Sequence, residues 1–169
     1  QTPSSVSFLY TASDGQNTGQ AEAVIRIENQ LPVAQADEYS YTWFEAVSVG
    51  AEHGVLADDY DHDADALEAV LLLGEGGPVA TGPITLSNAE GQTGELSLGS
   101  DGSFTFVPEE GATGEFTAFY RVSDGAPEAL TYTDPNLGVD PLSTLTIHLT
   151  NAVPIGQGDA FRTHHGEAI

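Results

Sequence analysis

The stretch Ala118-Phe119-Tyr120-Arg121-Val122-Ser123-Asp124-Gly125 occurs in a second version 110 positions earlier, as Phe8-Leu9-Tyr10-Thr11-Ala12-Ser13-Asp14-Gly15. Aromatic and β-branched residues that run into Ser-Asp-Gly are typical of a strand followed by a turn. Two versions of such a stretch in one chain indicate a repeat, and a repeat has to be delimited before any motif inside it is interpreted.

A second pair of matching segments lies 122 positions apart. These segments are Ile25-Arg26-Ile27-Glu28-Asn29-Gln30-Leu31-Pro32 and Ile147-His148-Leu149-Thr150-Asn151-Ala152-Val153-Pro154. The match continues through Gln35, Asp37, Tyr39 and Glu45-Ala46, which align with Gln157, Asp159, Phe161 and Glu167-Ala168. The two offsets differ because the second copy carries an enlarged loop within residues 126–143.

The repeat unit has about the length of one Ig-sized sandwich. The sequence therefore predicts three parts: residues 1–29 as the C-terminal strands of a preceding repeat, 30–150 as a complete repeat, and 151–169 as the N-terminal strand of a following repeat. Residues 29–32 and 151–154 are the expected linkers, in which a proline stiffens the junction and holds the preceding residue extended.

No segment shows a sustained helical period, and short β-branched or alternating runs are separated by Gly, Asp, Asn and Pro. This pattern predicts an all-β chain, and Asp101-Gly102 is the signal of a two-residue hairpin turn. The expected strands are 6–12, 21–27, 39–44, 67–73, 84–86, 94–98, 104–107, 116–122 and 145–149.

Charge is the most unusual feature of the composition. The chain has 26 Asp and Glu residues against three arginines and no lysine, with a net charge of −23. Such a charge excludes nucleic acid as a natural partner and repels an anionic membrane surface. Between Ile27 and Tyr120 no Lys or Arg is available to pair with the carboxylates, so solvent or metal must serve them. The absence of cysteine excludes disulfides and thiolate metal sites.

Four segments together resemble the bacterial cadherin-like and VCBS-type Ig-like tandem repeats of giant surface adhesins, including those with RTX tails. They are the linker Pro32–Tyr39, the acidic run Gly54–Leu67, the hairpin Asp101–Pro108 and the strand end Phe119–Gly125. The resemblance implies a cadherin-like Greek-key β-sandwich in an extracellular or cell-surface protein. Two departures are visible: the family usually has Asn where Asp58 stands and Gly where Ala64 stands.

The acidic run is the strongest candidate for a metal site. A curled loop can turn the carboxylates of Asp59, Asp61, Asp63 and Asp65 inward, and Ca²⁺ prefers six to eight oxygen ligands of this kind. An EF-hand is excluded because position 12, counted from Asp59, is Val70. The plain alternative is a solvated acidic loop.

Further calcium ligands are expected near the repeat junctions. Asp37 and its equivalent Asp159 follow the linker prolines, and Asp14 and Asp124 end strands expected at the same pole, so a metal there would clamp neighbouring repeats. Glu45 is a further candidate. Alternatively, Ser-Asp-Gly is only a turn in which Asp bonds its own backbone.

Other functions find weaker support. Trp43, Tyr39 and Tyr41 allow a sugar-stacking platform, and a carbohydrate-binding module or an ancillary domain of a secreted enzyme remains an alternative. No zinc-protease, nucleophile-elbow, phosphate-loop or dinucleotide motif occurs, so the chain itself is not expected to be an enzyme.

The expected role is therefore that of a calcium-stabilised structural repeat, a stiff spacer whose partners are neighbouring repeats or copies of the same chain, with polysaccharide or a cell surface as a further possibility. If the chain is a natural subunit, residues 1–29 of one copy can complete a sandwich begun by residues 151–169 of another and so build a filament. If it is a fragment, those ends are instead expected to be disordered or to fold back on the central repeat.

Overall fold

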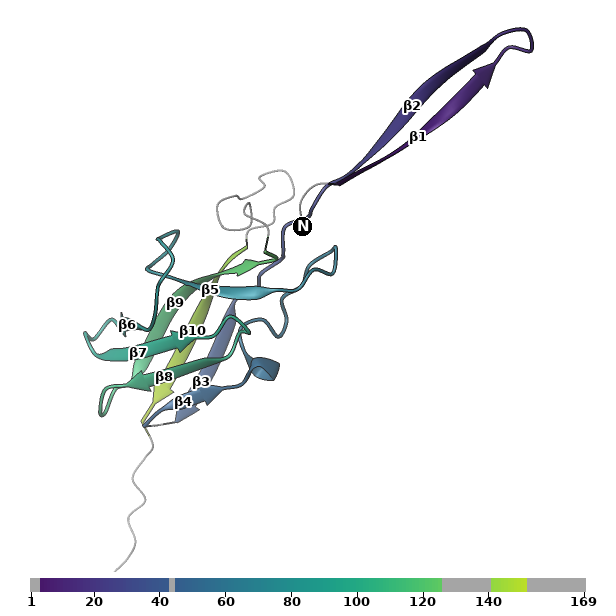
Figure 1. The fold of residues 1–169 in the computed structure, drawn as a ribbon. Coiled ribbons are helices and arrows are strands. Elements are labelled where there is room, and N and C mark those ends of the chain that lie inside the picture. The colour runs from purple at the N-terminus through teal and green to yellow at the C-terminus, as the bar shows by residue number, and fades with distance from the viewer. Residues whose placement is uncertain (1–3, 43–44, 126–140, 152–169) are drawn as a thin grey trace, which may run out of the picture.

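The computed structural model describes residues 4–42, 45–125 and 141–151. These residues form an all-β chain of a separate hairpin and two stacked four-stranded sheets (Figure 1). The hairpin consists of β1 (Ser4–Ser13) and β2 (Thr18–Ile27). The predicted all-β sandwich is confirmed, and Asp159 lies outside the described residues.

One sheet has the strand order β3-β10-β9-β5, and the other has the order β4-β8-β7-β6. The chain passes between the sheets after β3, after β4, after β5 and after β8. β3 runs parallel to β10, and all other neighbours are antiparallel. The bounds are β3 Asp37–Thr42, β4 Val47–Val49, β5 Glu68–Leu72, β6 Ile84–Ser87, β7 Thr93–Leu98, β8 Phe104–Pro108, β9 Gly114–Ser123 and β10 Leu142–Thr150.

The core lies between the two sheets because alternate residues of each strand point inward. In β9 and β10 every second side chain is buried, and Phe116, Tyr120 and Ile147 have no exposed surface. Phe106 from the opposite sheet packs against Phe116, with ring centroids 5.1 Å apart. This alternation is what the sequence pattern predicts for a sheet with one buried face.

All nine predicted strands are present, with ends shifted by a few residues. Two elements were not predicted: β4 and the 3₁₀ helix η1 (Ala51–His53). β4 has only three residues, of which Val47 alone is buried, so it is too short for a period-2 pattern to stand out.

The β7–β8 turn differs from the prediction of a two-residue loop. The hydrogen-bonded pair that closes the hairpin is Gly99 and Ser103, so the loop has three residues and ends on Gly102 at φ +84°. Such a loop needs a left-handed last residue, which glycine provides. Asp101 takes the turn role that was predicted for it, because its Oδ1 accepts hydrogen bonds from the amide and the hydroxyl of Ser103.

Gly54 fixes how the segment after η1 packs against this turn. A Cβ atom on Gly54 would lie 2.1 Å from the carbonyl oxygen of Gly102, so no larger residue fits without movement. The amide of the buried Val55 donates to the same carbonyl at 3.0 Å. The close approach anchors the start of the acidic run to the hairpin. No helix among the described residues is long and apolar enough to cross a membrane.

Candidate cation-binding pole

One end of the sandwich collects most of the predicted metal ligands. β3 begins at Asp37, and β9 ends beside Asp124 at the same end, because β10 runs parallel to β3 and antiparallel to β9. Residues 58–65, here called the acidic loop, lead into β5, whose Glu68 pairs with Ser123 of β9. We call this end of the molecule the acidic pole.

Residues 29–35, which precede β3 and are called the linker from here on, are attached to the acidic loop at several points. Val33 and Tyr60 exchange two backbone hydrogen bonds, of 2.8 and 3.2 Å. The amide of Gln35 donates to Asp59 Oδ1 at 2.7 Å, and its side-chain Nε2 donates to the carbonyl of Asp58. The amide of Gln30 donates to Asp63 Oδ2 at 2.8 Å. The linker is therefore held as an extra strand-like layer on the loop.

A further contact joins the linker to the end of β9. Asn29 Nδ2 donates to Asp124 Oδ2 over 2.7 Å, and only 9% of Asp124 is exposed. Asp124 thus holds the position at which the chain enters the pole.

Asp59 and Asp61 use their two carboxylate oxygens differently. In each residue Oδ1 accepts backbone hydrogen bonds: from Gln35 in the case of Asp59, and from the amides of Asp63 (2.7 Å) and Asp65 (3.2 Å) in the case of Asp61. The Oδ2 atom of each is buried without a hydrogen-bond donor. A buried carboxylate oxygen without a donor is costly unless an ion or ordered water satisfies it.

Around Tyr120, within the acidic pole, hydrogen-bond acceptors also outnumber the donors. Its hydroxyl lies 2.7 Å from Asp37 Oδ2, 2.9 Å from the carbonyl of Gln35 and 3.1 Å from the carbonyl of Val55. A phenol has one proton to donate, so it cannot serve three acceptors at once. Ser143 Oγ supplies a second proton, to the Gln35 carbonyl at 2.5 Å.

Burial disfavours the ionised form of two of these carboxyl groups in the metal-free chain. Desolvation raises the pKa of Asp37 to about 7, against the lowering effect of the Tyr120 hydrogen bond, and the charges of Asp58 and Asp59 add to the increase. Desolvation likewise raises the pKa of Asp59 to about 6, although the hydrogen bond from the Gln35 amide lowers it. A bound cation would remove this cost by favouring the charged forms.

The carboxylates of the described residues do not form a finished cage. No group of three or more Asp, Glu or His side chains among them is placed to hold a metal ion without movement. The oxygen donors that do lie close together combine side chains with backbone carbonyls, as around Tyr120, and Ca²⁺ accepts both kinds of ligand in flexible geometry. The chemistry of these oxygen atoms thus suits calcium, but their positions would have to shift locally to surround the ion.

Two of the other predicted ligands lie elsewhere. Asp14 is in the β1–β2 turn, where its Oδ1 accepts the amides of Asn17 at 2.6 Å and Gln16 at 2.9 Å, and these bonds lower its pKa. Glu45 follows β3, which begins at Asp37 and ends at Thr42, roughly 17 Å away at about 3.3 Å per strand residue. Neither is brought together with the acidic loop.

The predicted sugar platform is not assembled by the described residues. Tyr39 donates its hydroxyl to the His53 carbonyl at 2.7 Å and packs edge-on against Phe104, with centroids 4.9 Å apart. Tyr41 also packs against the core. Trp43 lies outside the described residues.

Several contributors to the pole were not predicted as site residues, namely Asn29, Gln30, Gln35 and Tyr120. A signal for three of them was present in the repeat, because Asn29, Gln35 and Tyr120 have identical counterparts in Asn151, Gln157 and Tyr10. These side chains carry no charge, so a pattern of carboxylates does not point to them.

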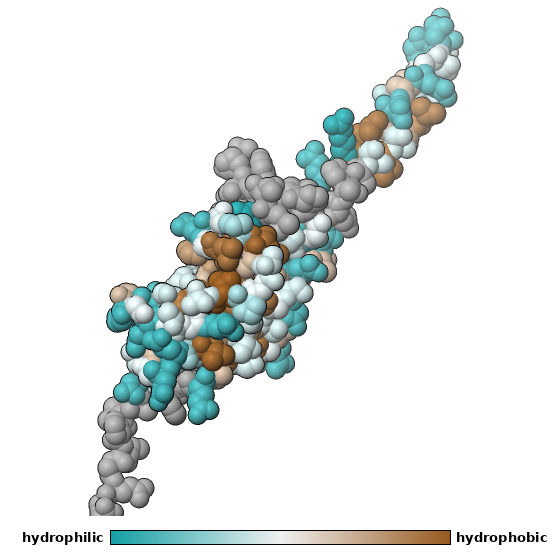
Figure 2. Space-filling view, turned by 60° about the vertical axis from the view of Figure 1, so that its left-hand side comes forward, coloured by the Kyte–Doolittle hydropathy of each residue, from teal (hydrophilic) through white to brown (hydrophobic). Residues whose placement is uncertain are grey.

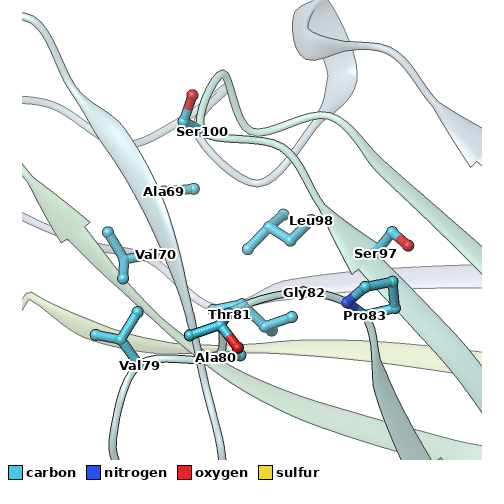
Figure 3. Close-up of a pocket in the computed structure, with 11 residues that line it drawn as sticks. Ala69, Val70, Val79, Ala80, Thr81, Gly82, Pro83, Ser97, Leu98 and Ser100 are labelled. Carbon is cyan, nitrogen blue, oxygen red and sulfur yellow. The ribbon is translucent and has the colours of Figure 1, made fainter.

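A pocket of about 370 Å³ opens between β5, β7 and the segment Val79–Pro83 (Figure 3). Its lining consists of small and apolar side chains with the hydroxyls of Thr81, Ser97 and Ser100. It contains no carboxylate, imidazole or basic group, so it lacks the groups that acid–base catalysis requires.

Comparison with protein families agrees with this architecture. Residues 29–135 match the family model of the bacterial cadherin-like domain. An endo-fucoidan hydrolase from glycoside hydrolase family 107 is similar in structure at a TM-score of 0.30 and 17% identity, over 87% of this chain and 22% of the hydrolase, so the chain spans less than a quarter of that protein. No curated protein matches significantly in sequence.

Only a cadherin-like domain is found by these comparisons, with no catalytic domain evident. Bacterial cadherin-like domains are typically found in extracellular or surface proteins. The family match covers most of the sandwich, including the linker, the acidic loop and β9. The chain belongs to the bacterial cadherin-like domain family.

Proposed function

We propose that this chain is a calcium-stiffened spacer of an extracellular bacterial surface protein, in which bound calcium locks the linker onto the acidic pole. The observation that carries the proposal is the pair of buried Oδ2 atoms on Asp59 and Asp61, which have no hydrogen-bond donor. Both residues already use Oδ1 to fix backbone amides, so their second oxygens are oriented before a cation arrives.

The cation would be held by residues of the acidic loop and the start of β3. Asp59, Asp61 and Asp37 supply carboxylate oxygens, and the carbonyls of Gln35 and Val55 supply neutral ones. Asp63 and Asp65 belong to the same loop, and Asp124 anchors the linker beside it. Calcium neutralises this cluster and suits its mixed, flexible oxygen donors better than magnesium, which prefers to keep its waters.

The mechanical consequence follows from the linker contacts. Residues 29–35 connect the preceding segment to the sandwich, and they are attached to the acidic loop at several points. A cation that fixes the loop therefore fixes the linker, and a joint that is flexible without calcium becomes stiff with it. Because arrays of repeats are governed by their nearest-neighbour junctions, stiff joints make a rod.

Such a rod holds a distal adhesive or anchoring part of the parent protein away from the cell. Its partners are neighbouring repeats, and the high negative charge keeps the units from associating with nucleic acid or anionic lipid.

Calorimetric titration of the metal-free chain with CaCl₂, and separately with MgCl₂, tests the proposal. Calcium should bind with measurable heat and magnesium much more weakly. Absence of calcium binding at millimolar concentration would contradict the proposed function, since extracellular calcium modules bind at about 10⁻⁴–10⁻³ M or tighter.

A further inference from the structure

The β1–β2 hairpin exposes an apolar face that the rest of the fold does not cover. Val6, Phe8, Tyr10, Ile25 and Ile27 lie on one face, because β1 and β2 pair Val6 with Ile25 and Ser4 with Ile27. Between 49% and 55% of each of these side chains is exposed. Brown, hydrophobic side chains are visible on the hairpin beyond the sandwich (Figure 2).

The hairpin has the same pairing register as β9 and β10 of the sandwich. In the sandwich Phe116 pairs with Ile147 and Ala118 pairs with Leu145. Subtraction of the repeat offsets, 110 for β9 and 122 for β10, turns these pairs into Val6 with Ile25 and Phe8 with Ala23, which are the pairs observed in the hairpin. Sequence repeat and strand register thus agree independently.

In one of these two pairs the large and the small side chain exchange strands. Where the sandwich pairs the small Ala118 with Leu145, the hairpin pairs the large Phe8 with the small Ala23. One large and one small apolar residue in either order can fill the same packing site, although the other pair changes from Phe116 with Ile147 to the smaller Val6 with Ile25.

The burial of the equivalent residues shows what the hairpin face lacks. Phe116, Tyr120 and Ile147 are fully buried, and Leu149 is 3% exposed. Their equivalents in the hairpin are Val6, Tyr10, Ile25 and Ile27, each about half exposed. In the sandwich this face is covered by the sheet β4-β8-β7-β6 and flanked by β3 and β5.

We infer that the face formed by Val6, Phe8, Tyr10, Ile25 and Ile27 is the docking surface for the first six strands of another cadherin-like unit, which the hairpin completes as its last two strands. The occupant places its β3 equivalent parallel to β2, its β5 equivalent antiparallel to β1, and its second sheet over the apolar face. The hairpin face carries no charged side chain, so this docking is driven by apolar burial and does not depend on a bound cation.

The occupant can be supplied from the chain itself. Residues 30–113 contain β3 to β8, and residue 113 is equivalent to residue 3. A fusion of residues 30–113 to residues 4–169 therefore contains two sandwiches in sequence. The first is completed by β1 and β2, and the second is the present one. Because the chain has no cysteine, single cysteines report accessibility cleanly.

The test compares Phe8→Cys, on the docking face, with Leu9→Cys, whose side chain points to the opposite face and is 69% exposed. In the 169-residue chain both thiols should react with a maleimide at similar rates. In the fusion the thiol at position 8 should react about 100-fold more slowly, while the thiol at position 9 stays reactive.

Hydrogen exchange of residues 4–27 in the unsubstituted fusion guards against a cysteine variant that fails to fold. These amides should exchange about 100-fold more slowly in the fusion than in the 169-residue chain. Unchanged exchange together with equal thiol rates would overturn the inference. Protection of position 8 in the 169-residue chain alone, accompanied by self-association, would also overturn it, because the occupant would then be a second copy of the hairpin or of the chain end.

Discussion

At the scale of single residues, the two oxygens of one carboxylate can have different tasks. Asp61 Oδ1 orders the acidic loop through the amides of Asp63 and Asp65, while its buried Oδ2 has no donor. Asp101, by contrast, uses its carboxylate within an exposed turn.

Asp61→Ala should therefore weaken calcium binding far more than Asp101→Ala, by about tenfold or more against less than about twofold. Calorimetric titration ranks the two variants, and circular dichroism of both checks that the sandwich is intact. Equal calcium affinities would place the site elsewhere.

Ala64 is the one non-glycine residue with positive φ in the described part of the chain, at +61°. A left-handed conformation costs an L-residue roughly 1–2 kcal/mol, and glycine relieves most of that strain at some cost in unfolded-state entropy. Ala64→Gly should raise the free energy of unfolding by about 0.5–1 kcal/mol in urea titrations. Ala66→Gly, just after the acidic loop and at a residue without positive φ, is the control and should lower the free energy of unfolding.

The raised pKa values of Asp37 and Asp59 predict the sign of the pH dependence. The unfolded carboxyls titrate near 3.8, whereas in the native state the pKa values are about 7 and 6. Between these limits the metal-free native state binds more protons than the unfolded chain, so its stability is greatest at low pH and falls as the pH rises through 6 to 7.

Urea unfolding in EDTA should accordingly show a metal-free chain that is more stable at pH 5 than at pH 8. Asp37→Asn should flatten this pH dependence. The variant thus distinguishes the titration of Asp37 from the general repulsion among the other carboxylates. Calcium binding should weaken over the same acidification, because protons compete for the ligands. A wild-type stability that rises from pH 5 to pH 8 in EDTA would contradict the assignment.

At the scale of elements, the close approach of two segments depends on Gly54. A Cβ there would overlap the Gly102 carbonyl, whereas a Cβ on Gly50, four residues earlier, would meet nothing within 4 Å. Gly54→Ala should destabilise the fold by roughly 1–3 kcal/mol and loosen the acidic loop that follows, while Gly50→Ala should change stability by less than about 0.5 kcal/mol. Thermal melting of the two variants decides between them.

The strands were predictable where one face is buried over several residues. β9 and β10 alternate so regularly that the pattern alone locates them. The repeat offsets relate the register of β1 with β2 to that of β9 with β10, but neither register was predicted from the sequence. β4 was missed because three residues carry too little pattern, and the β7–β8 loop was mistaken by one residue because Asp-Gly also ends a three-residue loop.

The acidic loop could be singled out as a candidate site because its alternating carboxylates have no nearby basic residue to pair with. The role of Tyr120 and of the Gln35 carbonyl was not, since neither residue is charged and their meeting depends on how β9, the linker and Val55 come together across the fold. Glu45 is near Asp37 in sequence but not in the fold, because β3 lies between them and Glu45 follows its other end.

At the scale of the whole molecule, the proposed calcium binding would offset part of the negative charge of the chain. With a net charge of −23, the chain compacts against self-repulsion, and the acidic pole concentrates part of that charge where the linker enters the sandwich. A cation bound only by the native pole adds stability in proportion to the logarithm of its concentration over its dissociation constant, about 2.7 kcal/mol at a hundredfold excess.

The most direct test of the account is the melting temperature of the chain, first verified to be calcium-loaded, in excess CaCl₂ and after addition of EDTA, with MgCl₂ in place of calcium as the control. If calcium locks the acidic pole, EDTA should lower the melting temperature by several degrees or more, and magnesium should restore little of the loss. A melting curve that is the same in CaCl₂ and in EDTA would contradict it.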